Sequence, residues 1–168
     1  KRQQPPAWFQ PSGDRAGAND SAHAGRRKMQ GSSWKHVEHD ADIGLQATAA
    51  SREGLFEAMG EALTAVITDP ASVRLERQVD IQCEAPDDAL LLVDWLNALI
   101  FEMASRRMLF GSWRVAIDGN KLDAVVEGET VHRARHRPVV EVKGATYTAL
   151  SVEQDGYGNW RGQCVVDV

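Results

Sequence analysis

The sequence predicts an α+β fold, with two layers: a mixed β-sheet and two helices packed on one of its faces. Two stretches have apolar residues at helical spacing, and each follows a segment in which apolar and other residues alternate. After the second helical stretch the chain has only alternating segments joined by turn signals, which is typical of hairpin-linked strands. The 168 residues, of which 43% are hydrophobic, suffice for one such domain.

The start of the chain differs in composition from the rest. Residues 1–33 are rich in proline, glycine, alanine, serine and charge, so we expect a flexible tail, which could include leader residues, before a domain at 34–168. Residues 1–30 carry six basic and two acidic side chains, which leaves a net charge of −9 for residues 31–168. So acidic a domain does not attract phosphate backbones through its overall charge. We therefore expect contact with RNA to run through a partner protein or a small basic patch.

The first predicted strand and helix follow one another directly. Residues 43–48 alternate between apolar and other side chains, with the period of a half-buried strand. Ser51 is a suitable helix cap, and apolar residues from Leu55 to Ile67 then recur at helical spacing. The run Thr68-Asp69-Pro70 predicts the end of this helix, because proline cannot continue it.

A second strand and helix repeat this order. Residues 79–84 alternate, and Pro86-Asp87-Asp88 predicts the start of a helix that reaches about Arg107. This helix is apolar around most of its circumference, so it should be the more buried of the two.

The remainder is predicted to be β-structure. Asp118-Gly119-Asn120 is a hairpin turn signal between alternating segments. The basic stretch 132–138 is interpreted as a solvated loop, although it could contact RNA or an acidic partner surface. Two further strands are expected at about 141–153 and 159–168.

Two features indicate the cellular compartment. Cys83 and Cys164 are far apart in the sequence and lie in apolar runs, so we expect reduced core residues rather than a disulfide. The longest apolar stretch, 89–101, is too short to span a bilayer, and the first residues do not resemble a signal peptide. We therefore expect a cytoplasmic protein without a membrane partner.

The densest polar cluster of the chain is His36–Gly44, and it leaves three interpretations open. His36 and His39, together with the aspartates, could bind a transition metal. Asp40 and Asp42 could share one face of an extended segment and hold a hard cation. The cluster could also be a solvated loop whose aspartates accept hydrogen bonds from nearby amides.

The last five residues favour the second interpretation. In a strand, Val168 shares a face with Cys164 and Val166, and Asp167 points the other way. The Asp167 side chain and the α-carboxylate of Val168 would put two anionic groups at one strand end, where partial burial demands a counter-charge. A divalent cation shared with Asp42 would supply it, and oxygen-only ligands favour Ca²⁺ or Mg²⁺.

Other polar residues are weaker candidates. Lys143 lies in an apolar strand, where it either pairs with a carboxylate or is an ordinary edge-strand lysine. Asp94 and Asn97 share the polar stripe of the second helix, which we interpret as solvent-facing. The chain has no glycine-rich phosphate loop, nucleophile elbow or cysteine-histidine zinc pattern, which argues against an enzyme that acts alone.

Four motifs of this chain resemble those of the archease family, and they occur in the family's order over about residues 35–168. They are Glu38–Gly44, Leu92–Asn97, Arg135-His136 followed by Glu141–Tyr147, and the closing Val166–Val168. In the first motif, Asp40 stands where the family usually has threonine. The added negative charge could tighten cation binding or supply a further ligand.

The resemblance implies a compact α+β fold and a role as activator of the GTP-dependent tRNA-splicing RNA ligase. Archeases promote guanylylation of the ligase's active-site histidine and allow multiple turnover, so this chain would be a protein cofactor of an enzyme. By the resemblance, Asp42, Asp167 and Val168 are the metal ligands, and Lys143 is needed for activation. We expect His39 and Asp40, beside the metal, to contact the partner.

Two alternatives remain at this point. The chain could be a stand-alone metal-dependent phosphohydrolase that uses His39, Asp40 and Asp42. It could also be a chaperone or assembly module with a purely structural metal.

Overall fold

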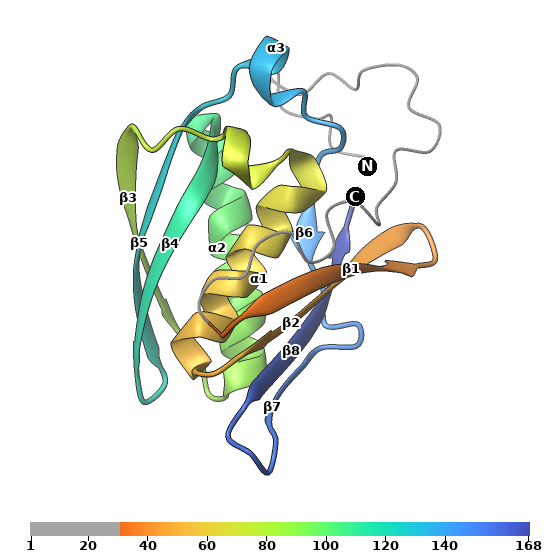
Figure 1. Ribbon diagram of the computed structural model, residues 1–168, viewed down its shortest axis with the longest axis vertical. Helices are drawn as coiled ribbons and strands as arrows, with labels where there is room; N and C mark the ends of the chain where they lie inside the picture. Colours follow the sequence, from red (N-terminus) through yellow and green to blue (C-terminus); the bar gives the residue numbers. More distant parts are fainter. Residues whose placement is uncertain (1–30) are drawn as a thin grey trace.

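Short strands and two long helices make up the protein, whose computed structural model describes residues 31–168 (Figure 1). In chain order the elements are β1 (Ser33–His39), β2 (Asp42–Ala49), α1 (Arg52–Ile67), η2 (Pro70–Ser72), β3 (Arg77–Glu84), α2 (Asp88–Arg106), β4 (Met108–Asp118), β5 (Lys121–Thr130), α3 (Arg133–His136), β6 (Gly144–Ala145), β7 (Ser151–Gln154) and β8 (Trp160–Asp167). The expected tail lies almost entirely outside the described residues, and Ser33, its last residue, already belongs to β1. No helix within residues 31–168 is both long and apolar enough to cross a membrane.

The strands form two antiparallel sheets. One has the order β1-β2-β8-β6, with β7 also paired to β8, and the other has the order β3-β5-β4. The helices α1 and α2 lie between the two sheets and contact both of them (Figure 1). The α+β class is confirmed, but the strands do not form one mixed sheet with both helices on one face. The physical reason is that both helices carry apolar residues around much of their circumference, so each buries one side against each sheet.

The first strand, β1, was not expected from the sequence. It pairs with β2 in a hairpin whose register joins His39 to Asp42, and residues 40 and 41 form the turn. His36 is polar although it faces inward, so the sequence of β1 lacks the usual alternation of apolar and polar residues. Its Nε2 lies 2.8 Å from the carbonyl oxygen of Ala62 on α1, so a histidine can occupy a position that an apolar residue would otherwise fill.

Both long helices begin and end as their capping residues predict. The Ser51 hydroxyl accepts a hydrogen bond of 3.0 Å from the Gly54 N–H, and the Asp87 carboxylate accepts one of 2.8 Å from the Leu90 N–H. The first helix ends before Pro70, and the second ends at Arg107, whose φ of 54° is left-handed. The predicted hairpin is also confirmed, because Asp118 pairs with Lys121 across a two-residue turn.

The prediction of one long strand at about 141–153 is wrong. Only Gly144–Ala145 and Ser151–Gln154 are strands, and each pairs with a different part of β8. The chain leaves the sheet between them, where Ala149 has a left-handed φ of 51° that no regular strand contains. Residues 133–136 form one helical turn, α3, instead of the expected loop.

The two cysteines are free, as expected. Cys164 is buried and Cys83 is half-buried, and both pack with the apolar core between the sheets. Burial raises the pKa of each thiol to about 11, so both are protonated at neutral pH.

Candidate functional site

The start of β2 and the end of β8 lie next to each other in the five-stranded sheet. These two strands are antiparallel neighbours, and their register pairs Ile43 with Val166. One residue further along, the first residue of β2 is Asp42 and the last residue of β8 is Asp167. Opposed positions on neighbouring strands place their side chains on the same face of a sheet. The two carboxylates therefore share one edge and one face of this sheet.

That face is the one turned away from the helices. Leu45 and Val166 are fully buried in the core between the sheets, and Asp42 and Asp167 are at the alternate positions of the same strands. Asp42 is half-buried and Asp167 is exposed. The pair is thus open to a solvent ion or to a partner protein.

Asp42 and Asp167 form a row across the sheet, called the carboxylate row below. This row continues into β1, where His39 lies opposite Asp42. The Asp40 carboxylate is 4.0 Å from His39 Nδ1 but is 97% exposed, because Asp40 forms the hairpin turn with a φ of 54°. Aspartate tolerates this left-handed conformation better than a β-branched residue does. The turn therefore gives a structural reason for aspartate at position 40.

Lys143 lies next to Asp167 on the side of β8 that is away from Asp42, because β8 lies between β2 and β6. Its N–H donates a hydrogen bond of 2.8 Å to the carbonyl oxygen of Asp167, one residue before β6 begins. Its side chain is exposed, and its positive charge lowers the pKa of Glu141, although burial raises that pKa more strongly. The backbone of Lys143 is therefore held next to Asp167, and its side chain is open to solvent.

Val168 follows directly after Asp167. Its side chain is half-buried and packs against the core, on the same side as Cys164 and Val166. This packing fixes the main chain at the end of β8 next to the start of β2.

These donors suit a hard cation better than a transition metal. Among the described residues, no three side chains of histidine, cysteine, aspartate or glutamate come close enough to enclose a metal ion. Two carboxylates and main-chain oxygen at Val168 are the groups that the sheet edge offers. Mg²⁺ and Ca²⁺ bind such oxygen atoms and complete their coordination with water or with ligands from another molecule. The residues present therefore fit an open site, not a closed cage.

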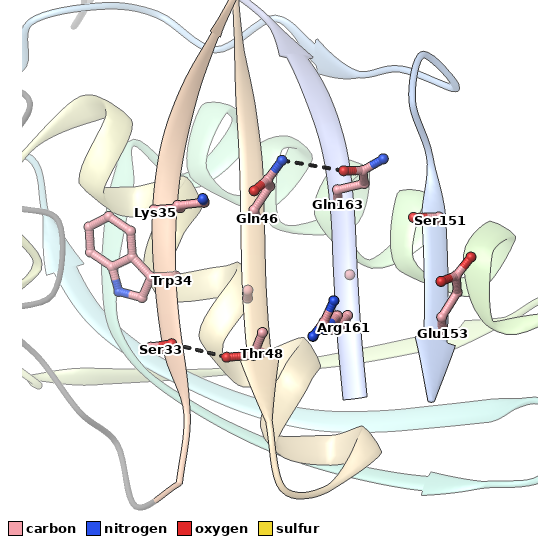
Figure 2. Close-up of a pocket in the computed structure, with 11 residues that line it drawn as sticks. Ser33, Trp34, Lys35, Gln46, Thr48, Ser151, Glu153, Arg161 and Gln163 are labelled. Atoms are coloured by element: carbon pink, nitrogen blue, oxygen red, sulfur yellow. Dashed lines mark hydrogen bonds between the residues drawn. The ribbon is translucent and has the colours of Figure 1, made fainter. Parts of the chain in front are cut away.

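A hollow of about 690 Å³ lies on the same face of the sheet (Figure 2). Gln46 Nε2 donates a hydrogen bond of 3.3 Å to Gln163 Oε1 across its floor, and Lys35 and Arg161 supply positive charge. Gln163 is four residues from Asp167 along β8, or about 13 Å at strand spacing. Between them on this face lies an apolar row of Val37, Gly44 and Val165, so the hollow is separate from the carboxylates.

Sequence reasoning missed the role of a buried glutamate, Glu129, at the end of β5. The basic stretch that follows is not a simple solvated loop, because Arg135 donates two hydrogen bonds to the Glu129 carboxylate. The carboxylate also accepts from the Arg74 N–H and lies 3.2 Å from His136 Nε2. These bonds pin α3 to β5. Only the local spacing of Glu129, Arg135 and His136 could have indicated such a cluster.

The charges of this cluster are strongly coupled. Hydrogen bonding from Arg135 lowers the pKa of Glu129 to about 2, which outweighs the opposite effect of burial. Burial lowers the pKa of His136, so this ring is neutral near pH 7. Its Nδ1 accepts a hydrogen bond of 2.8 Å from the His132 N–H, which fits the neutral form.

Asn97 is exposed, like Asp94, so the solvent-facing stripe predicted for these two residues is confirmed. The sequence did not predict that the Asn97 side chain also contacts β6. Its Oδ1 accepts a hydrogen bond of 2.9 Å from the Ala145 N–H, and its Nδ2 lies 3.4 Å from the Ala145 carbonyl oxygen. The only sequence signal was an amide at the edge of an apolar helix.

Comparison with known proteins places this arrangement in a family. Residues 34–168 match the model of the Archease protein family. A protein archease of Pyrococcus furiosus is 33% identical over 139 residues, which are 80% of this chain and 98% of that protein. A protein archease of Methanopyrus kandleri is 34% identical over 139 residues, which are 80% of this chain and 99% of that protein.

A solved structure has the same fold. The solution structure of Methanobacterium thermoautotrophicum protein 1598 matches with a TM-score of 0.67 and 22% sequence identity. The match covers 80% of this chain and 98% of that one. At this identity the likeness concerns the fold.

Proposed function

This chain belongs to the Archease protein family, and from that premise we propose that it activates a GTP-dependent tRNA-splicing RNA ligase in the cytoplasm. In this proposal it promotes guanylylation of the ligase and multiple turnover, and it acts as a protein cofactor instead of an enzyme. The observation that carries the proposal is the row in which Asp42 and Asp167 lie together on an uncovered sheet face.

The row is the proposed cation site. The Asp42 and Asp167 carboxylates and main-chain oxygen at Val168 would hold Ca²⁺ or Mg²⁺, and the remaining coordination positions face away from the protein. When bound there, such a cation supplies positive charge that orients phosphate oxygens. The acidic domain itself offers little other attraction for phosphates, so the activity depends on this edge of the sheet.

The residues around the row have separate proposed tasks. Lys143 supplies a fixed positive charge for a phosphate or for an acidic group of the ligase. His39 and Asp40 lie at the hairpin turn beside the carboxylates, where a docked partner would contact them. RNA is contacted only through the ligase.

The experiment is multiple-turnover joining of RNA ends by the cognate ligase with GTP, in the presence and absence of this protein. Asp42→Asn keeps the size of the side chain and removes its charge. Asp123→Asn, an exposed aspartate on β5 of the other sheet, is the matched control. We expect the wild-type protein and the control to raise the number of turnovers per ligase, and Asp42→Asn to fail.

Other outcomes separate this proposal from its rivals. Phosphoester hydrolysis by the isolated protein, lost in Asp42→Asn, would favour the stand-alone phosphohydrolase. A folded Asp42→Asn variant with a lower melting temperature but full stimulation would favour a structural metal. Either result overturns the proposal.

A further inference from the structure

The two-residue strand β6 has a neighbour on only one side. Residues Gly144 and Ala145 pair with Asp167 and Val166 of β8, and no strand within residues 31–168 lies on the far side of β6. The Ala145 N–H and carbonyl groups would then point out of the sheet without partners. An unpaired edge of this kind leaves so short a strand with little to hold it in place.

The side chain of Asn97 takes the position of the missing strand. Its carboxamide accepts from the Ala145 N–H at 2.9 Å, and its Nδ2 is 3.4 Å from the Ala145 carbonyl oxygen. A carboxamide has the same donor and acceptor groups as a peptide unit, so asparagine can satisfy both groups of one residue. Glutamate or lysine at this position could satisfy only one of them.

Asn97 projects from a helix that is itself firmly held. Its neighbours Trp95 and Leu96 are fully buried, and the Trp95 indole N–H donates a hydrogen bond of 2.9 Å to the Phe56 carbonyl oxygen of α1. The Asn97 side chain itself is exposed, but it projects from a helical turn whose neighbouring residues are fixed in the core. Its two contacts with Ala145 join β6 to this turn of α2.

We propose that Asn97 is a positioning residue for Lys143, an inference that rests on the function proposed above. Lys143 is two residues before Ala145, and its own N–H is bonded to the Asp167 carbonyl oxygen at 2.8 Å. The segment that carries Lys143 is therefore attached at two points, to Asp167 and to Asn97. Loss of the Asn97 attachment frees one of them, and the backbone of Lys143 is then held next to Asp167 by its own N–H alone.

A double-mutant cycle tests this inference, because two residues that act through one another give non-additive effects. The rate of ligase guanylylation is measured with wild-type protein, Asn97→Ala, Lys143→Ala and the double variant. This rate is measured because it still reports the activation that remains in Lys143→Ala, so that Lys143→Ala can be compared with the double variant. Asn97→Asp retains the acceptor for the Ala145 N–H and serves as the milder variant. Ser105→Ala, which removes a different hydrogen bond of α2, is the matched control.

We expect Asn97→Ala to lower the rate about 5-fold in the wild-type background, the effect of two lost hydrogen bonds, and to change it less than about 1.5-fold in the Lys143→Ala background. Asn97→Asp should lie between wild type and Asn97→Ala, and Ser105→Ala should match wild type. An equal loss in both backgrounds overturns the inference, and so does full activity of Asn97→Ala. If instead Lys143→Ala itself retains full activity, the role that the proposed function gives to Lys143 is wrong, whatever the effect of Asn97→Ala.

Discussion

Asp42 and Asp167 occupy opposed positions at the ends of two antiparallel strands, one residue beyond the pair that joins Ile43 to Val166. Lys143 completes this meeting point through its backbone hydrogen bond to Asp167. Three segments that are far apart in the sequence thus converge at one edge of the five-stranded sheet. The strand order alone brings them together, because β8 lies between β2 and β6.

Replacement of Lys143 by alanine should reduce ligase activation by about tenfold or more, because hydrogen bonds to charged groups contribute most to recognition. The side chain is exposed, so stability should hardly change. Ligation turnover and a thermal melt measure the two effects. Lys121→Ala, an exposed lysine of the other sheet, is the control, and an equal loss of activation in both variants would contradict the assignment.

Replacement of Glu129 by glutamine should destabilise the fold by about 3 kcal/mol, because it leaves Arg135 without its buried counter-charge. Glu127→Gln is the matched control on the same strand, since its partner Arg114 is at the surface at 3.3 Å. That control should lose less than about 1 kcal/mol. Urea unfolding of the three proteins measures both values, and similar losses would argue against a structural role for the buried cluster.

The same cluster predicts a dependence of stability on pH. The pKa of Glu129 is lowered from 4.5 to about 2, and the pKa of His136 is lowered from 6.5. A group whose pKa is lower in the folded state stabilises the fold above its unfolded value and loses that contribution as the pH falls. We therefore expect the urea midpoint to be level above about pH 6.5 and to decrease toward pH 2.

The Glu129→Gln variant isolates the carboxylate part of this profile. Below pH 4.5 its curve should be flatter than that of the wild-type protein, because the variant has no carboxylate to protonate at this position. Parallel curves below that pH would show that other carboxylates govern the acid transition.

Replacement of Gly128 by alanine should prevent normal folding or cost more than about 3 kcal/mol, as severe overpacking does. A Cβ atom at this position would lie 1.8 Å from the carbonyl oxygen of Leu109, next to the register shift between Phe110 and Ser112. Gly119→Ala is the comparison, because nothing lies within 4 Å of its Cβ and only its φ of +61° is unfavourable. It should cost about 1 kcal/mol in a thermal melt. Equal melting temperatures for the two variants would contradict the backbone clash.

Local sequence signals predicted the helices well and the strands less well. Ser51 and Asp87 cap the two long helices as expected, because a capping bond depends only on residues three positions apart. β1 was missed because His36 faces inward and is paired with Ala62, a contact between residues far apart in the sequence. The residues around β6 have a strand-like composition, but their pairing partner on β8 decides where the chain leaves the sheet.

The candidate site divides in the same way. Residue types and the family resemblance predicted that Asp42 and the chain end at Asp167 and Val168 lie together, and the strand register agrees. Cation binding by these residues stays a prediction. The contact of Asn97 with Ala145 and that of Glu129 with Arg135 could not, because each depends on packing or on a turn that no periodic pattern encodes. The left-handed turn of the β1–β2 hairpin gives a reason for aspartate at position 40, and a role of its charge in cation binding stays a prediction.

A shared cation is the claim on which the other statements depend. Calorimetric titration of Ca²⁺, and separately of Mg²⁺, into the wild-type protein, Asp42→Asn and Asp167→Asn measures it directly. Asp80→Asn, an exposed aspartate on β3, is the control for a general loss of negative charge.

We expect one cation to bind per wild-type chain and per Asp80→Asn chain, and each site variant to bind it about tenfold more weakly or not at all. Wild-type affinity in both Asp42→Asn and Asp167→Asn would contradict the account.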